Sequence, residues 1–215
     1  MSKTKTVTYT SENTYSTLNR LTPHTKNIWF VFHGLGYLSK YFIEYFNELN
    51  PEENYIVALQ APSKYYQDLT FKHVGASWLT RVNTEMEIEN ILNYIRAVYE
   101  REVDKHPAKL FVLGYSQGVS IAARWVARHR IGVHKLILHS GGIPKELKKG
   151  DFDFLPEDVP VIYLYGDKDQ YVTEARKTEA RLQGENLFGH RLIIKVFDGI
   201  HEVHRELIKQ QASDK

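Results

Sequence analysis

Residues 110–123 read LFVLGYSQGVSIAA, and this stretch decides the fold. Its first four residues are apolar, as in a buried strand, and its last five follow the pattern of a helix. Between these two parts, Gly114 and Gly118 flank Ser116 in the pattern G-x-S-x-G. In such an elbow the serine lies in a strained turn that exposes its hydroxyl above the sheet, and the glycines let strand and helix approach closely. The sequence therefore predicts that the functional centre begins at Ser116.

The bulk composition is that of an ordinary soluble globular protein. The chain has 215 residues, of which 42% are hydrophobic and 25% charged, and this predicts one domain over residues 1–215. A net charge of +2 gives no reason to expect a nucleic acid as partner. No stretch has the roughly 18 apolar residues of a membrane span, and the N-terminus lacks the apolar run of a secretion signal, so we expect a cytoplasmic protein. The absence of cysteine excludes disulfides, thiolate metal sites and a cysteine nucleophile.

Apolar runs alternate with helical patterns along the chain. The predicted strands cover residues 28–32, 55–59, 110–113, 136–139, 161–165 and 192–197. The predicted helices cover residues 39–49, 84–99, 119–123, 173–183 and 202–211. This alternation predicts an α/β fold with a mostly parallel central sheet and helices on both faces. Only about twenty residues separate the strands that end at 139 and begin at 161, which leaves no room there for a cap domain.

Three further local features carry structural predictions. Residues 6–18 alternate polar and apolar side chains around a polar centre and predict an edge hairpin. Residues 62–80 are irregular and rich in tyrosine and lysine, which predicts a long loop of the kind that is often functional. Thr84 and Glu87 have the spacing of a capping box at the start of a helix.

A nucleophilic serine needs a general base and an acid that orients the base, and in this type of fold the acid precedes the histidine along the chain. The strand at 161–165 runs into a turn that contains Asp167 and Asp169, and either aspartate could be the acid. We favour Asp169, because a turn that begins at Gly166 brings the third residue after it back toward the strand end, whereas Asp167 caps the turn. Since aspartate is common in turns, a purely structural role for both is the alternative.

The last strand ends before Gly199, and His201 follows at the start of the next helix. This position favours His201 as the general base. His204 is the competitor, but it lies further along the helix, where an exposed or packing role is expected. The neighbouring residues resemble a zinc motif, yet the pattern H-E-x-x-H needs a second histidine at position 205, where the chain has arginine. We therefore expect no metal.

The oxyanion of an acyl-transfer reaction needs backbone N–H donors, each worth roughly 3–4 kcal/mol in serine enzymes. One donor is the residue after the nucleophile, here Gln117, and the other comes from a loop after an early strand. The loop His33-Gly34-Leu35-Gly36 is in that place, and Leu35 is the candidate second donor. For the His33 side chain we expect hydrogen bonds to neighbouring loops and no proton transfer.

With these motifs the chain resembles the α/β-hydrolase superfamily, and within it the phospholipase/carboxylesterase group that includes acyl-protein thioesterases. The matching pieces run from residue 28 to residue 201 and are the 33–36 loop, Gln60-Ala61-Pro62, Ser77-Trp78, the elbow, Ser140-Gly141-Gly142-Ile143-Pro144, Gly166 with Asp169 and Val172, and Gly199 with His201. The resemblance implies hydrolysis of carboxylic esters or thioesters without a cofactor. The chain departs from the group at Tyr37 and Gln170, where an acidic residue and a proline are common, and these departures concern the substrate.

Aromatic side chains on the predicted loops favour an apolar acyl site at the carboxyl ends of the strands. Tyr37, Tyr65, Trp78 and Ile143 are the candidate substrate contacts. The alternative is that such residues only pack a loop onto the core. Without a cap domain the site should be shallow, which favours a small-molecule ester with a short acyl chain.

The expected activity is that of a serine esterase, with Ser116, His201 and Asp169 in the catalytic roles. Two alternatives are an acyl-thioesterase or lysophospholipase, and a non-catalytic binding module on a hydrolase scaffold, since a fold alone does not prove activity. We expect neither a nucleic acid partner nor stable insertion into a membrane. The oligomeric state cannot be read from the sequence.

Overall fold

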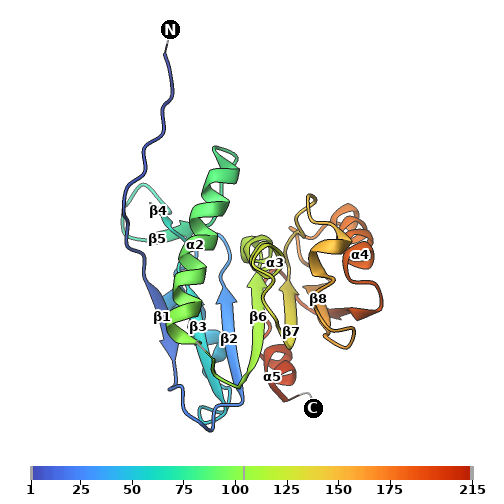
Figure 1. Ribbon diagram of the computed structural model, residues 1–215. Coiled ribbons are helices and arrows are strands. Elements are labelled where there is room, and N and C mark those ends of the chain that lie inside the picture. The colour runs from blue at the N-terminus through green and yellow to red at the C-terminus, as the bar shows by residue number, and fades with distance from the viewer. Residues whose placement is uncertain (1, 104, 214–215) are drawn as a thin grey trace.

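The computed structural model describes residues 2–103 and 105–213, and a seven-stranded sheet lies at its centre (Figure 1). The strand order is β1-β3-β2-β6-β7-β8-β9. The strands are β1 (Tyr15–Leu18), β3 (Asn54–Leu59), β2 (Asn27–Phe32), β6 (Lys109–Tyr115), β7 (Lys135–His139), β8 (Val161–Gly166) and β9 (Leu192–Phe197). All neighbours pair in parallel except the edge strand β1, which runs antiparallel to β3. The predicted mostly parallel sheet is therefore confirmed.

The register of the parallel strands brings their carboxyl ends to one edge of the sheet. Phe32 of β2 lies opposite Gly114 of β6, and Tyr115 of β6 lies opposite His139 of β7. At the far side, Gly166 of β8 lies opposite Phe197 of β9. Loops that leave the sheet at this edge can therefore combine their side chains in one site, which is where ligands bind in open parallel sheets.

Helices cover both faces of the sheet. The helices are α1 (Ser39–Phe42), η1 (Ile43–Phe46), α2 (Thr84–Glu102), α3 (Gln117–Arg128), η2 (Lys149–Phe152), α4 (Glu174–Phe188), η3 (Gly189–Arg191) and α5 (Arg205–Ser213). Buried residues of α2, α3 and α4 share one hydrophobic cluster, whereas α1, η1 and α5 share the cluster on the other face (Figure 1). The connection between β7 and β8 contains only η2 and loops, so the fold has no cap domain.

Strand β2 is buried over its whole length because its side chains enter both clusters in alternation. Phe30 stacks on Trp125 of α3, with ring centroids 5.3 Å apart. On the opposite face, Trp29 meets Phe111 of β6 edge-on at 4.8 Å. These large rings fill the space between the sheet and the helices on each side, and they explain why the run at 28–32 reads as continuously apolar.

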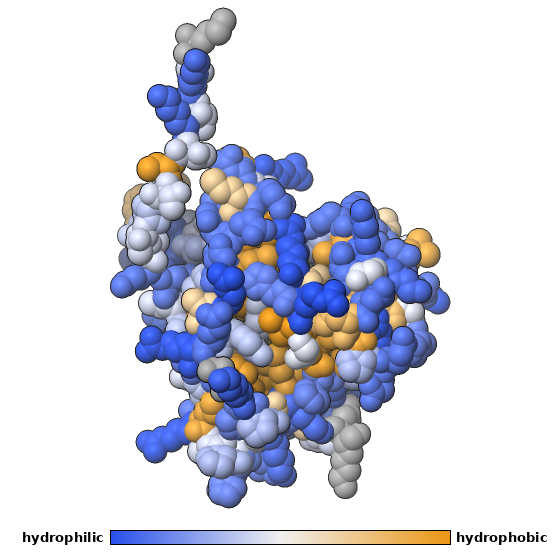
Figure 2. Space-filling model, in the orientation of Figure 1, coloured by the Kyte–Doolittle hydropathy of each residue, from blue (hydrophilic) through white to orange (hydrophobic). Residues whose placement is uncertain are grey.

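The visible outer surface is mostly hydrophilic, and the hydrophobic colour gathers near the middle of this face, around α3 (Figure 2). Among the described residues no helix has the length and apolar character to cross a bilayer.

Helix α2 confirms the helix predicted at residues 84–99 but not its capping box. Its apolar residues Ile88, Ile91, Leu92, Ile95 and Val98 are buried. The predicted capping box does not form: the N-cap is Asn83, which has a left-handed backbone and makes no side-chain cap. The hydroxyl of Thr84 instead donates to Thr80 O at 2.9 Å. The box does not form because Thr84 is already the first helical residue, and the Glu87 N–H donates to Asn83 O at 3.1 Å.

Two predictions for irregular segments need correction. Of the hairpin predicted over residues 6–18, only β1 is a strand, and it pairs with β3 rather than with its own neighbour. The segment at 62–80 is not only a loop, because β4 (Ser63–Tyr66) and β5 (Val74–Ser77) form a separate antiparallel pair within it. The polar, aromatic residues of β4 are exposed, so this strand lacks the buried apolar face on which a sequence-based prediction depends.

Helix α3 approaches strand β2 so closely at Gly118 that only glycine fits, since a Cβ there would lie 2.2 Å from Phe32 O. We expect Gly118→Ala to lower the free energy of unfolding by about 1–3 kcal/mol, the cost of forced overpacking. Gly132→Ala is the matched control, because nothing lies within 4 Å of its Cβ position, and its effect should stay within about 0.5 kcal/mol. Urea denaturation of both variants measures this, and equal midpoints would contradict the assigned role of Gly118.

Candidate active site

Ser116 lies between β6 and α3 in a backbone conformation that side-chain-bearing residues seldom adopt. Its φ is 53° and its ψ is −117°. Its N–H donates to His139 O of β7 at 2.8 Å, which fixes the turn to the neighbouring strand. Glycines make room around it: a Cβ on Gly114 would lie 2.5 Å from Gly118 O, and one on Gly141 would lie 2.1 Å from Ser116 O. Strain of this kind persists only where the surrounding structure imposes it, and such strain clusters at functional sites.

The structure brings together the three side chains that the sequence selected. His201, from the loop between β9 and α5, has Nε2 3.0 Å from Ser116 Oγ. Its Nδ1 lies 2.7 Å from Oδ2 of Asp169, which follows β8. The Asp169 side chain is fully buried, and its Oδ1 accepts the N–H groups of Tyr171 at 2.8 Å and Val172 at 3.2 Å. A carboxylate held in this way accepts Nδ1–H and leaves Nε2 of His201 free to receive a proton from the serine.

Asp167 has the turn-stabilising role that the sequence suggested. Its Oδ1 accepts the Gly199 N–H at 3.0 Å, and its own N–H donates to Phe197 O at 2.9 Å. These bonds join the turn after β8 to the turn after β9. A Cβ on Gly166 would lie 2.4 Å from Gly199 O, so the two turns are in direct contact. This contact sets the position of Asp169 relative to His201.

His204, the alternative base, takes a structural position instead. Its N–H donates to Nε2 of His139 at 3.2 Å, and its ring packs against Phe197 with centroids 4.6 Å apart. Among residues 2–103 and 105–213 no cluster of three or more histidine, aspartate or glutamate side chains is arranged to hold a metal ion.

Two tyrosines hold the His201 imidazole. Tyr115, the residue before Ser116, donates its hydroxyl to His201 O at 3.1 Å, and its ring lies 5.2 Å from the imidazole. Burial raises the pKa of Tyr115, so its hydroxyl stays a neutral donor. Tyr171 meets the imidazole edge-on at 4.8 Å. These contacts restrict rotation of the ring and favour the orientation that faces both Ser116 and Asp169.

The two predicted oxyanion donors lie near Ser116: Gln117 follows it in the chain, and Leu35 lines the same cavity. Gln117 is the first residue of α3, and the N–H groups at the start of a helix have no partner within the helix. Leu35 lies in the loop after β2, and among the described residues no acceptor is bonded to its N–H. Gly36 has φ of 85°, and Tyr37 N–H donates to Gly34 O at 3.3 Å, which closes a turn around Leu35. Both N–H groups are thus left available for a ligand.

His33 is buried and uncharged. Its Nε2 accepts the Ala61 N–H at 3.1 Å, so the proton is on Nδ1, which donates to Gly34 O at 2.7 Å. Burial lowers the pKa of His33 to about 4. Because both ring nitrogens are engaged by backbone groups, His33 supports the Leu35 loop and has no free nitrogen for proton transfer.

A cavity of about 370 Å³ opens over Ser116 and His201. Its remaining lining residues are Gly34, Leu35, Tyr37, Tyr115, Lys168, Gln170, Tyr171 and Ile200. Tyr37 is therefore where the sequence placed it. Lys168, Tyr171 and Ile200 were missed, and Gln170 was named only as a departure from the family, although each is within two residues of Asp169 or His201 in the chain. This closeness in sequence was the signal that could have identified them, because loop residues next to Asp169 and His201 leave the sheet at the same edge.

The other three candidate substrate contacts do not line this cavity. Trp78 is fully buried and donates Nε1–H to His33 O at 2.8 Å, so it packs the loop onto the core. Ile143 is also buried, on the inner side of α4 near Gly184. Tyr65 lies on the exposed strand β4, outside the cavity. The sequence showed that these residues are apolar and near strand ends, but not which way they point.

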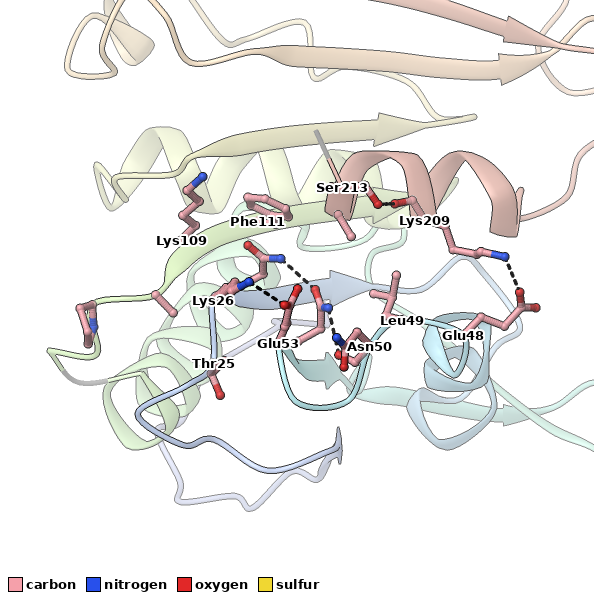
Figure 3. A pocket seen from close by; sticks show the side chains of 15 residues that line it. Thr25, Lys26, Glu48, Leu49, Asn50, Glu53, Lys109, Phe111, Lys209 and Ser213 are labelled. Atoms are coloured by element: carbon pink, nitrogen blue, oxygen red, sulfur yellow. Dashed lines mark hydrogen bonds and ion pairs between the residues drawn. The ribbon is translucent and has the colours of Figure 1, made fainter. Parts of the chain in front are cut away.

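A larger cavity, of about 670 Å³, lies at the opposite edge of the sheet (Figure 3). It is bordered by the first residues of β2, β3 and β6, namely Asn27, Asn54 and Lys109. Ion pairs between Lys26 and Glu53 and between Lys209 and Glu48 cross its rim. Since parallel strands carry their active sites at the carboxyl ends, the smaller cavity over Ser116 is the candidate active site.

The parallel sheet, the strained serine elbow and the loops at the carboxyl ends of the strands define an α/β-hydrolase. A family model described as phospholipase/carboxylesterase matches residues 14–208. The chain therefore belongs to the phospholipase/carboxylesterase family, and it is a hydrolase of the esterase and thioesterase type.

Solved structures share this fold at low sequence identity. An acyl-protein thioesterase 2 from Zea mays aligns with a TM-score of 0.69 and 14% identity over 94% of this chain and 96% of its own. A phospholipase/carboxylesterase from Dyadobacter fermentans aligns with a TM-score of 0.67 and 19% identity over 96% and 99% of the two chains. A Bacillus cereus carboxylesterase gives 0.66 and 12%, over 92% and 91%. A search of curated proteins gives no match.

Because the His139 side chain is buried beneath the site, we expect the free energy of unfolding to depend on pH. Burial, and then the nearby His201 and His204, lower its pKa to about 3, whereas an unfolded histidine titrates near 6.5. The unfolded chain therefore binds the extra proton first, and stability is lost as the pH falls from about 6.5 toward 3. Between pH 7 and pH 5 this amounts to roughly 2 kcal/mol.

His139→Gln removes this titration and keeps an acceptor for the His204 N–H. We expect the variant to lose roughly 2 kcal/mol less unfolding free energy than the wild type between pH 7 and pH 5, as measured by urea denaturation at each pH. Equal losses in both proteins would show that His139 does not cause the effect.

Proposed function

We propose that this protein is a serine esterase that cleaves small or short-chain carboxylic esters through an acyl-enzyme intermediate. The observation that carries the proposal is the position of His201, with one nitrogen 3.0 Å from Ser116 Oγ and the other 2.7 Å from buried Asp169. This arrangement lies at the base of a cavity that can hold a small molecule. Acyl transfer by a serine requires a nucleophile, a general base and an orienting acid within hydrogen-bond distance of one another, and the three side chains at this strained elbow have that spacing.

In the first half-reaction, Ser116 Oγ attacks the acyl carbonyl carbon while its proton passes to His201 Nε2. The carbonyl oxygen becomes an oxyanion that accepts from the N–H groups of Leu35 and Gln117. When the intermediate collapses, the bond to the leaving group breaks and His201 gives its proton to the leaving oxygen. In the second half-reaction a water attacks the acyl carbonyl carbon and gives a proton to His201 Nε2. The bond between the acyl carbon and Ser116 Oγ then breaks, His201 returns the proton to Oγ, and the carboxylic acid leaves. Asp169 keeps its negative charge and orients the imidazolium, and the scheme needs no cofactor.

The cavity argues for a compact acyl group. Its volume is about 370 Å³, and the residues that line it include Tyr37, Lys168, Gln170, Tyr171 and Ile200. A thioester or a lysophospholipid would meet the same nucleophile, so the leaving group decides among these substrates. We propose a soluble, cytoplasmic enzyme that acts on small molecules.

Removal of the nucleophile tests the mechanism. We expect Ser116→Ala to reduce hydrolysis of p-nitrophenyl butyrate by a factor of about 10⁴ or more, while the melting temperature changes little. A fluorophosphonate probe should label the wild type and leave the variant unlabelled. Ser213→Ala, at an exposed serine on α5, is the control and should keep both activity and labelling. Normal turnover by Ser116→Ala would refute the serine mechanism, and a wild type without turnover or labelling would favour a binding module.

Chain length tests the substrate class. We expect kcat/KM to be at least about tenfold higher for the p-nitrophenyl butyrate than for the laurate, since each poorly accommodated methylene costs binding energy in the transition state. A panel with matched butyryl thioester and lysophospholipid substrates compares leaving groups on the same scale. A preference for laurate would contradict the compact acyl site.

A further inference from the structure

The side chain of Gln117 makes hydrogen bonds to residues 77–79 and does not line the cavity. Its Oε1 accepts the Trp78 N–H at 2.8 Å. Its Nε2 donates to Leu79 O at 2.8 Å and to Ser77 Oγ at 3.1 Å. The carboxamide thus fastens the end of β5 and the two residues after it to the first turn of α3. The backbone N–H of the same residue is the proposed oxyanion donor next to Ser116.

The segment held by Gln117 also holds the loop of the other donor. Trp78 donates its indole N–H to His33 O at 2.8 Å. Ala76 O accepts the Gly36 N–H at 2.9 Å. These two bonds lie on either side of Leu35, one before it in the chain and one after it. Residues 76–79, which we call the brace, therefore connect both halves of the proposed oxyanion hole through hydrogen bonds.

We propose that the Gln117 carboxamide is a positioning group: through the brace it sets the distance between the Leu35 N–H and the Gln117 N–H. This inference rests on the proposed function, because the two N–H groups matter only if an oxyanion forms at Ser116. The carboxamide does not touch the substrate. It acts by preorganising two donors that come from loops far apart in the chain, and donors must be in place before charge develops if they are to stabilise the transition state.

Direct packing is the competing explanation for the same geometry. Positions near the elbow are already tight, since a Cβ on Gly34 would lie 3.0 Å from the Tyr115 ring and 3.1 Å from Ser116 Cβ. If this contact alone fixed the loop, loss of the carboxamide would leave the donor distance unchanged. The two explanations therefore predict different kcat values for a variant that lacks the Gln117 carboxamide. Packing alone predicts the wild-type kcat, whereas a positioning role predicts a lower one.

Gln117→Met tests the proposal, because methionine has a similar length, carries no charge and keeps the backbone N–H. We expect kcat for p-nitrophenyl butyrate to fall about ten- to hundredfold while KM changes less than about twofold, since a donor displaced by a fraction of an ångström is lost mainly in the transition state. The Ki of a trifluoromethyl ketone, which forms a tetrahedral adduct with Ser116, should rise in parallel with the loss in kcat/KM.

Gln183→Met is the matched control. Gln183 of α4 also fastens a loop through its carboxamide, donating to Pro144 O at 3.3 Å and Leu147 O at 3.2 Å, but it lies outside the cavity lining. We expect its kcat and Ki to match the wild type even if its melting temperature falls. A structural effect alone would lower the melting temperature in both variants and leave kcat unchanged in both.

Trp78→Phe extends the test along the brace. It removes the indole donor to His33 O and should lower kcat by itself. Because both changes interrupt one path, the double variant should lose less than the product of the single losses. If Trp78→Phe does not fold, the comparison of Gln117→Met with Gln183→Met decides.

The outcomes separate this inference from the proposed function. If Gln117→Met keeps the wild-type kcat and Ki while Ser116→Ala is inactive, the positioning role is wrong and the serine mechanism stands. If Ser116→Ala keeps its turnover, the proposed function fails and this inference fails with it.

Discussion

The close contact between α3 and the ends of β2, β6 and β7 is the constraint on which the rest of the site depends. Three glycines make it possible, and the most crowded is Gly141, where a side chain would overlap the carbonyl of Ser116. The contact forces Ser116 into its unusual backbone conformation and points the hydroxyl toward the loops at the strand ends. The paired turns that carry Asp169 and His201 place their side chains in hydrogen-bond contact with one another and with this hydroxyl.

The sequence predicted the parallel sheet, and the structure places Asp169 rather than Asp167 beside His201, as expected from the position of each aspartate in the turn after β8. Prediction from the sequence failed where direction matters more than position. Trp78 reads as a ligand-binding aromatic residue, yet its side chain turns inward and supports a neighbouring loop. Likewise, all residues of strand β4 are exposed, so the sequence has no apolar periodicity there from which a strand could be predicted. Backbone geometry of this kind is set by tertiary contacts, which local patterns do not contain.

Electrostatics divides the histidines at the strand ends into two kinds. His33 and His139 are buried, hold their partners through neutral rings, and have pKa values lowered to about 4 and about 3. His201 differs because a buried carboxylate faces one of its nitrogens. Burial without a counter-charge keeps an imidazole neutral, so His33 and His139 act as rigid connectors. The same edge of the sheet therefore holds two neutral connecting histidines and one histidine that contacts both a serine hydroxyl and a carboxylate.

The β4–β5 pair combines an exposed turn with residues that are bound to the site. Residues 68–73 are exposed, whereas Gln67 donates to Gly36 O at 2.7 Å and the end of β5 is bound to both the loop after β2 and the start of α3. The turn at residues 68–73 can be lengthened or shortened at little cost in stability, because closure entropy changes only slowly with loop length. Residues near Ala76 have no such freedom. Changes at the turn of this hairpin can thus create new binding surfaces while the geometry beside Ser116 stays the same.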